Sequence, residues 1–411
     1  MLAKGIRLYK NSFAGLSRDI WLLAAVTLLN RAGTMVIPFM TVFLTHQKGF
    51  TLQQAGWVMT SFGVGSVLGS YTGGWLSDRY NFSKVQFWTL LLSGIMFILL
   101  QTVDGVWHMC IAVFVLSAIA DAFRPANMAA VATYSTPETR TRSLSLNRQA
   151  INLGFAIGPA VGGWLAATKG YNWLFWVDGL TCIAAAFLLR ILLTPKARQT
   201  ELEKPEAQNT AVLISAYRDW HYLAFMVITM FSAIAFMQLF YTYPVFLKSE
   251  YHLSEGYIGS LMALNGLLIA VTEMPLVYTL EKRFALPVMI GVGYFMVAAS
   301  FLIFNIFAGG VLIPLISMIV VTLGEMLYLP FTNSLAMSRP QAANRGQYMA
   351  VYTMSFSIAH VVAPMLGLQI AGRMGYEALW YVTAGFCFIA FAGLWLLRGP
   401  LATSRWAAKL V

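Results

Sequence analysis

The sequence predicts an all-α membrane protein with twelve transmembrane helices arranged as two six-helix repeats. Composition is the first reason, because 59% of the 411 residues are hydrophobic and only 10% are charged, with a mean hydropathy of +0.69. Soluble domains carry about 25% charged residues. The second reason is length, since apolar runs of about 20 residues, enough to cross a ~30 Å hydrocarbon layer as helices, recur along the chain. The third is an internal duplication.

Apolar runs bounded by turn residues and charges predict the individual spans. They cover residues 20–45, 54–77, 86–103, 107–133, 143–167, 172–194, 221–247, 256–279, 285–307, 311–337, 345–371 and 376–398. The first run is too long for the core of a signal peptide and lacks a small-residue cleavage site, so we expect it to remain as a helix.

A polar stretch at residues 195–219 divides the spans into two groups of six. We expect it to form a cytoplasmic linker between an N-terminal bundle, residues 1–194, and a C-terminal bundle, residues 220–411. Several pairs of residues in the two halves match at an offset of 205: Pro125 with Pro330, Pro159 with Pro364, and Gly170-Tyr171 with Gly375-Tyr376. Parallel repeats are a layout of secondary transporters, whose substrate site lies near the bilayer midplane between the halves.

Positive charge follows the predicted topology. If both termini are cytoplasmic, 21 of the 27 Lys and Arg residues lie on the inner side, two lie within the membrane, and four lie outside: Lys48, Lys169, Lys248 and Arg373. This bias orients multi-pass proteins, so we expect cytoplasmic termini. The net charge of +11 is spread over short loops and forms no single stripe, which argues against a nucleic-acid partner.

Two motifs stand out beside the predicted spans. After the second span the chain reads Gly-Trp-Leu-Ser-Asp-Arg, which includes Gly74, Asp78 and Arg79. The fifth span carries a polar pair and a glycine ladder: Arg148, Asn152, Gly154, Gly158, Pro159, Gly162 and Gly163. Glycines four residues apart share one helix face and allow a neighbouring backbone to approach closely, while the proline permits a bend. Tight helix packing alone would also explain this spacing.

These motifs resemble those of the major facilitator superfamily, and the similarity covers nearly the whole chain. The loop departs from the family pattern at Asn81, where a glycine is expected. The fifth-span motif resembles that of the drug:proton antiporter group. Two shorter motifs are similar to those of bacterial drug and dipeptide exporters, namely Asn30-Arg31 before Pro38 and Gly324-Glu325 before Pro330. The resemblance implies a gating role for the loop and a location in the bacterial inner membrane.

Charged residues inside the spans are the candidates for proton coupling and for the substrate cavity: Arg31, Asp121, Arg124, Glu273 and Glu325. An ionisable side chain at mid-membrane costs about 2.5–3.5 kcal/mol on insertion scales, so it is usually paired or turned toward a cavity. Asp121 and Arg124 are three residues apart and can pair, either as a folding device or as a proton-coupling group. Glu325 has no basic residue within a turn of its helix, so we expect Arg31 to meet its charge or a proton to neutralise it.

Other polar and aromatic residues of the spans are weaker candidates for substrate contact: Asn30, Phe240, Tyr241, Tyr243, Asn333 and His360. Packing explains each of them as well. Asp178, near the start of the sixth span, is expected to be structural. The three cysteines lie in apolar runs without CxxC spacing, so we expect packing residues and neither disulfides nor a metal site. Phosphate-loop, HExxH and GxSxG motifs are absent from the sequence, which argues against an ATP-driven pump or an enzyme.

The sequence therefore favours a proton-coupled antiporter that exports small amphipathic molecules such as drugs or dipeptides by alternating access. Its partners would be the substrate, protons and the bilayer. It would need no cofactor beyond the proton gradient, and we expect a monomer. A proton-driven importer of peptides or similar nutrients is the alternative, favoured by the arginine of the first span and the Gly-Glu pair of the tenth. A membrane sensor without transport would need a soluble domain or long tail, which this sequence lacks.

Overall fold

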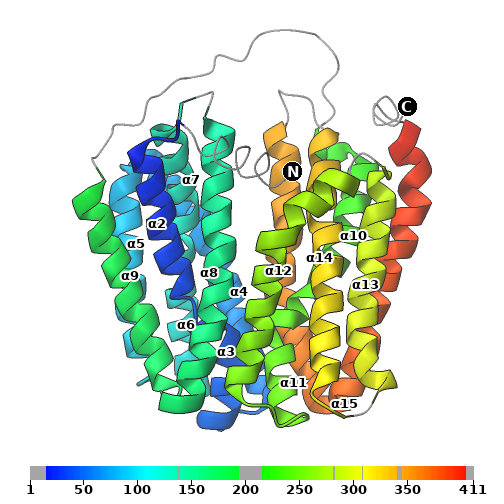
Figure 1. The fold of residues 1–411 in the computed structure, drawn as a ribbon, viewed down its shortest axis with the longest axis horizontal. Helices are drawn as coiled ribbons and strands as arrows, with labels where there is room; N and C mark the ends of the chain where they lie inside the picture. Colours follow the sequence, from blue (N-terminus) through cyan, green and yellow to red (C-terminus); the bar gives the residue numbers. More distant parts are fainter. Residues whose placement is uncertain are drawn as a thin grey trace, which may run out of the picture. The chain divides into compact units, whose positions relative to one another are not determined.

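A computed structural model describes residues 15–136, 139–193, 215–280, 283–307, 309–339 and 345–403. Within these ranges the regular structure is helical and no strand occurs (Figure 1). Most of the predicted linker, residues 195–214, lies outside the described residues.

The first half of the chain forms a series of long helices with one interruption in the first span. They are α2 (Arg18–Ala32), α3 (Val36–Val42), the π-helical turn η1 (Phe43–Gln47), α4 (Leu52–Arg79), α5 (Phe82–Leu100), α6 (Val106–Asp121), α7 (Phe123–Tyr134), α8 (Arg140–Lys169) and α9 (Asn172–Leu192). The fourth predicted span is made of α6 and α7, which meet at Ala122.

The second half repeats this pattern. It contains the short 3₁₀ turn η2 (Ala216–Arg218), α10 (Trp220–Tyr241), α11 (Tyr243–Ser249), α12 (Glu255–Leu280), α13 (Leu286–Ile306), α14 (Leu312–Ser338) and α15 (Arg345–Thr403). Two helices merge in α15 at Gly375, whose backbone is not helical, with φ +88° and ψ +168°. Gly170, its predicted equivalent in the first half, has φ +91° and ψ +165°. The shared conformation, which L side chains rarely adopt, supports the duplication.

Ten helical segments of the described residues are long and apolar enough to cross a membrane. One of them, Gln347–Leu397, is 51 residues long and contains the junction at Gly375, so it accounts for two of the predicted spans. The second predicted span corresponds to α4, which has 28 residues but is not among the ten. Its glycine, serine, threonine and glutamine residues lower its hydropathy.

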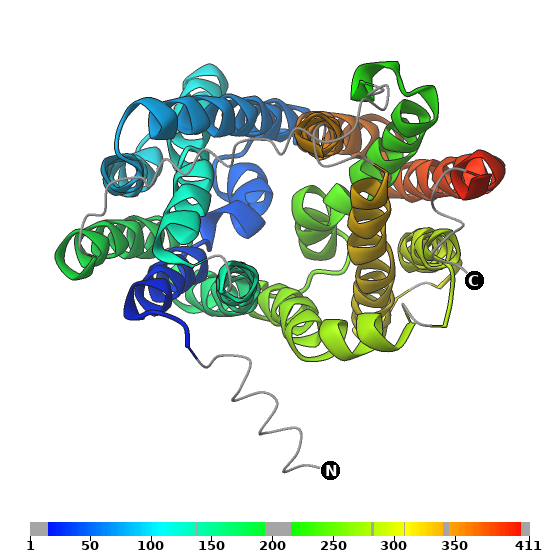
Figure 2. The same ribbon diagram turned by 90° about the horizontal axis from the view of Figure 1, so that it is seen from above.

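The chain divides into two compact units. The first comprises the chain up to Phe39 and from Ser61 through α9, and within it α2 packs on α8 and α9, while α5 packs on α6 and α9. The second comprises Met40–Thr60 together with the helices that follow the linker. There α10 packs on α15, and α13 packs on α14 and α15. Figure 2 shows the same helices from above, some end-on and others obliquely.

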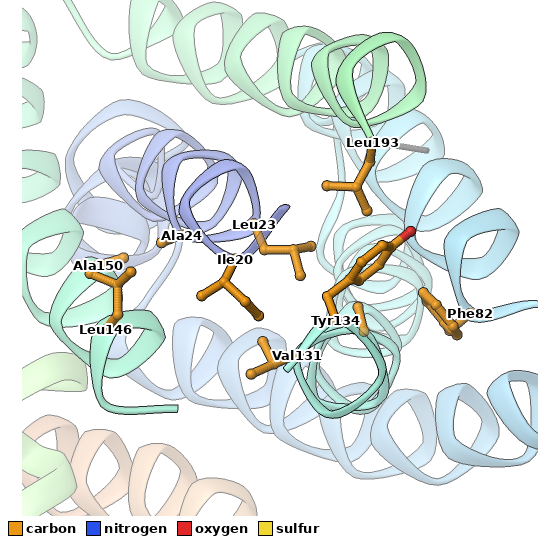
Figure 3. Packing of buried hydrophobic residues seen from close by; sticks show 10 residues of the cluster. Ile20, Leu23, Ala24, Phe82, Val131, Tyr134, Leu146, Ala150 and Leu193 are labelled. Atoms are coloured by element: carbon orange, nitrogen blue, oxygen red, sulfur yellow. The ribbon is translucent and has the colours of Figure 1, made fainter. Parts of the chain in front are cut away.

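An apolar cluster joins four helices and Leu193, the residue after α9, at one end of the first unit (Figure 3). Ile20 and Leu23 of α2 lie beside Val131 and Tyr134 of α7, and the Tyr134 ring meets the edge of Phe82 with ring centroids 6.0 Å apart. Further members are Leu146 and Ala150 of α8 and Leu193 directly after α9, and all of these side chains are buried. Close packing takes the place of the hydrophobic effect between helices in a lipid layer, so this cluster holds the helix ends in register.

Residues Met40–Thr60 join the second unit through contacts with α15. An added Cβ at Gly56 would lie 3.3 Å from the Cβ of Leu368, and one at Gly372 would lie 2.5 Å from Gln53 Nε2. The side-chain amide of Gln369 donates a hydrogen bond to the backbone oxygen of Gln53 over 3.4 Å. The end of the first span and the start of α4 therefore share their packing with the second half of the chain.

An ion pair joins three helix ends of the second unit. Asp219 precedes α10 and accepts a hydrogen bond from the backbone N–H of Tyr222 at 3.2 Å, so it caps that helix. Arg339, at the end of α14, donates from Nη2 to Asp219 Oδ1 at 2.7 Å, and the hydroxyl of Tyr348 donates to Oδ2 at 2.9 Å. Burial acts to raise the pKa of Asp219, but these hydrogen bonds outweigh it and hold that pKa below its usual value.

This depressed pKa gives a prediction for stability against pH. The contribution of Asp219 is fully present above its unfolded-state pKa of about 3.9 and is lost as pH falls through the lower folded-state value. We expect Asp219→Asn to lower the free energy of unfolding by about 2 kcal/mol at neutral pH, a usual loss for hydrogen bonds to a charged group. Thermal unfolding in detergent should show the gap to wild type closing below about pH 4. The Glu377→Gln variant, which changes an exposed carboxylate, serves as the control. A stability difference between Asp219→Asn and wild type that does not change with pH would contradict the stabilising role of the ionised Asp219 carboxylate.

Candidate functional site

In the first unit the predicted carboxylate is Asp121, at the end of α6. Its side chain is 9% exposed, and Oδ1 lies 2.8 Å from Nε of Arg124, which is 50% exposed. The structure thus contains the pair expected from their spacing. Oδ2 accepts a short hydrogen bond from the hydroxyl of Ser66 on α4. Both carboxylate oxygens therefore have a partner, and one of those partners comes from a helix that the sequence did not connect with Asp121.

Arg31 lies in the last turn of α2, directly before the break in the first span. Its guanidinium carbon lies 5.8 Å from the centre of the Phe155 ring on α8. Its Nε atom is buried and has no hydrogen-bond partner among the described residues. Asp121 and Arg124 are its charged electrostatic neighbours. A cation–π contact offsets part of the cost of burying this charge, but it does not replace hydrogen bonds.

The break after Arg31 is fixed by Asp178 of α9. The Asp178 carboxylate accepts hydrogen bonds from the backbone N–H groups of Met35 and Val36, each at 2.9 Å, and the residue is 1% exposed. These N–H groups begin α3, so Asp178 caps that helix from another span. This contact gives Asp178 the structural role expected for it.

The fifth-span glycines pack directly on this segment. An added Cβ at Gly154 would lie 2.4 Å from the Cβ of Arg31, and one at Gly158 would lie 2.9 Å from the backbone oxygen of Thr34. One at Gly162 would lie 2.9 Å from the Cβ of Met35. The remaining residues of the motif also lie on α8: Arg148, Asn152, Pro159 and Gly163. The ladder thus positions the backbone that carries Arg31.

A second glycine ladder, which the sequence reading missed, lies on α4. Added Cβ atoms at Gly65, Gly69 and Gly73 would lie 2.3–2.4 Å from the backbone oxygens of Phe114 and Ala118 in α6 and of Ala122 directly after it, respectively. Gly74 faces Pro125, with an added Cβ 4.0 Å from the proline Cβ. The four-residue spacing of these glycines, which also occurs in the fifth span, was the sequence signal that could have indicated this packing.

Gly74 and Arg79 of the predicted gating loop lie in the last turns of α4, which ends at Arg79, so this segment is helical and not a loop. Arg79 places its guanidinium carbon 5.3 Å from the centre of the Trp75 ring. The side chain of Asp78 lies outside the described part of the structure, so its expected role is still a prediction.

An uncharged network connects four helices of the first unit and was also missed. Thr27 donates to Asn147 at 2.9 Å, and the Asn127 amide donates to both Thr27 and Asn147 at 3.2 Å. Gln86 donates to Asn127 at 3.1 Å. All four residues are buried. Amides and hydroxyls change hydropathy less than charges do, so no hydropathy signal singled these four residues out.

In the second unit the carboxylate of Glu325 on α14 accepts a hydrogen bond from the amide of Asn265 on α12 at 3.0 Å. The same amide lies 2.9 Å from Oγ1 of Thr322. Glu273, on α12, is an electrostatic neighbour of Glu325. Among the described residues no basic side chain forms an ion pair with Glu325. The structure therefore brings together two of the predicted carboxylates and adds an amide that the sequence did not indicate.

The weaker candidates for substrate contact have different surroundings. The hydroxyl of Tyr241 lies 2.9 Å from Nδ1 of His360, which joins α10 to α15. Tyr243 is 1% exposed and donates to the backbone oxygen of Pro314 at 3.0 Å, so it is a packing residue in this structure. Phe240 meets the edge of a neighbouring ring on α10. Asn30 donates to Cys182 at 3.4 Å, whereas Asn333 is exposed.

The close approach at Gly154 gives a prediction. We expect Gly154→Ala to destabilise the protein by about 1–3 kcal/mol, the usual range for overpacking, because the new methyl group collides with Arg31. Gly385→Ala is the matched control, since an added Cβ there meets nothing within 4 Å and alanine favours helix formation. Thermal unfolding in detergent measures both variants. Equal stability of the two variants would show that α2 and α8 can move apart at Gly154 without loss of free energy.

The uncharged network gives a second prediction. Asn127→Ala removes three hydrogen bonds and leaves buried polar partners, which should cost about 2 kcal/mol of stability. The control is Asn305→Ala, which removes one hydrogen bond at the surface of the fold. Denaturation in detergent should show a larger loss in the free energy of unfolding for Asn127→Ala than for Asn305→Ala. An Asn127→Ala variant as stable as wild type would contradict a structural role for the network.

Comparison with known proteins agrees with this architecture. A family model described as Major Facilitator Superfamily matches residues 20–364. The Na(+), Li(+), K(+)/H(+) antiporter of Planococcus maritimus is 22% identical over 90% of this chain and 93% of its own. Multidrug resistance protein 2 of Bacillus subtilis is 23% identical over 88% of this chain and 90% of its own.

Among solved structures, a POT family transporter in complex with 5-aminolevulinic acid is similar with a TM-score of 0.80. The two share 13% sequence identity, over 95% of this chain and 98% of that one, so the likeness concerns the fold. The matched family consists of membrane transporters and not of enzymes. The chain therefore belongs to the Major Facilitator Superfamily and has its all-helical, multi-pass fold.

Proposed function

We propose that the protein is a proton-coupled antiporter that exports small amphipathic molecules by alternating access. The observation that carries the proposal is that each unit holds one carboxylate of the fourth or tenth predicted span in a polar setting. Asp121 is held by Arg124 and Ser66, whereas Glu325 is held by an uncharged amide. A carboxylate in low-dielectric surroundings changes its proton occupancy when access to water changes.

The relatives support the same proposal. One is named as a cation/proton antiporter and another as a multidrug resistance protein, and each covers most of this chain. Protonation from the outer side would neutralise Asp121 or Glu325 and release substrate. Loss of the proton to the inner side would prepare the protein for the next substrate. The glycine ladders would keep the helices of each unit packed during this cycle.

We also propose that the protein acts as a monomer in the bacterial inner membrane, with both termini in the cytoplasm. The distribution of lysine and arginine residues supports this orientation.

Proteoliposomes that contain a pH-sensitive dye test the coupling. We expect substrates added to one side of wild-type vesicles to evoke proton movement in the opposite direction. Asp121→Asn or Glu325→Gln should reduce this movement to background, because neither amide can carry a proton. Glu377→Gln removes an exposed carboxylate and should retain it.

The direction of proton movement decides between antiport and import. Proton movement in the same direction as the substrate would establish a symporter and overturn the export proposal. Proton flux that persists when both carboxylates are neutralised together would show that other groups carry the proton.

A further inference from the structure

Two hydroxyl groups are buried inside the second unit without a protein partner. Tyr294 of α13 is 0% exposed, and its hydroxyl has no hydrogen-bond partner among the described residues. Thr332 of α14 is equally buried, and its hydroxyl also lacks a partner in that part of the chain. A buried polar group without a hydrogen bond destabilises a fold, so two of them in one place require a physical explanation.

The two hydroxyls belong to a group of four. The hydroxyls of Thr229 and Ser232, on α10, lie around that of Tyr294 together with that of Thr332. None of these three meets the geometry of a hydrogen bond with the Tyr294 hydroxyl. Polar groups from α10, α13 and α14 therefore face one another inside the unit without a direct hydrogen bond to Tyr294.

The four hydroxyls divide into two acceptors and two donors. Thr229 donates its hydrogen to the backbone oxygen of Phe225 at 2.9 Å, and Ser232 donates to that of Thr229 at 2.8 Å. Toward the centre of the group these two oxygens can only accept, because each hydroxyl has a single hydrogen. The hydroxyls of Tyr294 and Thr332 have no acceptor among the described residues, so each still has a hydrogen to donate.

We propose that these four hydroxyls bind one water molecule. A water molecule donates two hydrogen bonds and accepts two, so it donates to Thr229 and Ser232 and accepts from Tyr294 and Thr332. Buried water molecules make about three such bonds and belong to the folded structure, so the site needs no open path for a ligand. The four hydroxyls carry no charge and two of them present hydrogens, which disfavours a metal cation.

The packing of the helices keeps the hydroxyls apart. Gly293, next to Tyr294, lies against α14, where an added Cβ would be 2.8 Å from the backbone oxygen of Gly324. The two backbones already touch, so α13 and α14 cannot move closer to join Tyr294 directly to Thr332. The ring of Tyr328 lies beside that of Tyr294, with centroids 5.5 Å apart, and its hydroxyl is also buried and without a partner among the described residues.

The water molecule gives the second unit an adjustable polar link. It joins three helices, and it can turn and keep its hydrogen bonds when the side chains around it shift. A direct bond between two side chains would hold them in one geometry. This inference does not depend on the coupling or the direction of transport.

Radiolytic labelling of the purified full-length protein in detergent tests the site on the wild type. An X-ray pulse converts bound water into hydroxyl radicals that oxidise the nearest side chains, and heavy-oxygen water marks the products for mass spectrometry. We expect Tyr294 to take up the label severalfold faster than Tyr243, which is 1% exposed and donates directly to a backbone oxygen. Equal rates at the two tyrosines would overturn the proposal.

Thr332→Val connects the label to the four hydroxyls, because it removes one hydroxyl and keeps a branched side chain. We expect slower labelling of Tyr294 and a lower melting temperature, since the water molecule loses a partner. Removal of an unpartnered hydroxyl from a dry site would instead raise the melting temperature. Thr353→Val removes an exposed hydroxyl of α15 and should leave the labelling of Tyr294 unchanged.

Two results with Thr332→Val would overturn the site. One is a melting temperature equal to or above that of wild type, which would show that the hydroxyl had no bound water to hold. The other is labelling of Tyr294 at the wild-type rate, which would show that the water molecule lies elsewhere.

Discussion

Polar groups inside a hydrocarbon layer must find their partners within the protein, and this constraint organises the described structure. The clearest case is Asp178, which accepts two backbone N–H groups where the first span is interrupted. Without that carboxylate the start of α3 would expose unpaired donors away from water. The interruption places Arg31 at a helix end, and the fifth-span glycines then fit against the same stretch of backbone. One hydrogen-bonded cap thus stabilises the break that directly follows the helix end carrying Arg31.

The two units meet this constraint in different ways. The first unit uses an ion pair, a hydroxyl and a set of amides, so its acidic group is compensated by a positive one. The second unit surrounds its acidic group with an amide and a second carboxylate. The two halves share the order of their helices and the positive-φ glycines at the turns expected to be equivalent, Gly170 and Gly375. They do not share the polar partners of the two carboxylates.

Much of the fold could be predicted from the sequence, because hydropathy and helix length leave few alternatives for an apolar chain. The pairing of Asp121 with Arg124 was also accessible, since the two residues are three positions apart and the junction of α6 and α7 at Ala122 keeps a helical backbone. Ser66 and Asn265 were not accessible, because their contacts depend on which helices become neighbours and which way each side chain points. The interruption after Arg31 carried no strong signal either, since it is stabilised by a residue more than 140 positions away.

The ladder of Gly65, Gly69 and Gly73 has a mechanical consequence. Each of these glycines lies against a backbone oxygen of α6 or of Ala122 directly after it, with successive contacts one helical turn apart. Sliding α4 along α6 by less than a full turn would drive larger side chains into that backbone, so the two helices resist shear and act as one stiff rod. α4 continues past Gly74 to Arg79 at one end of this pair of helices, and Ser66 of α4 binds Asp121 at the end of α6. Displacement of that end of α4 would therefore move the hydrogen-bond partner of the carboxylate together with the helix.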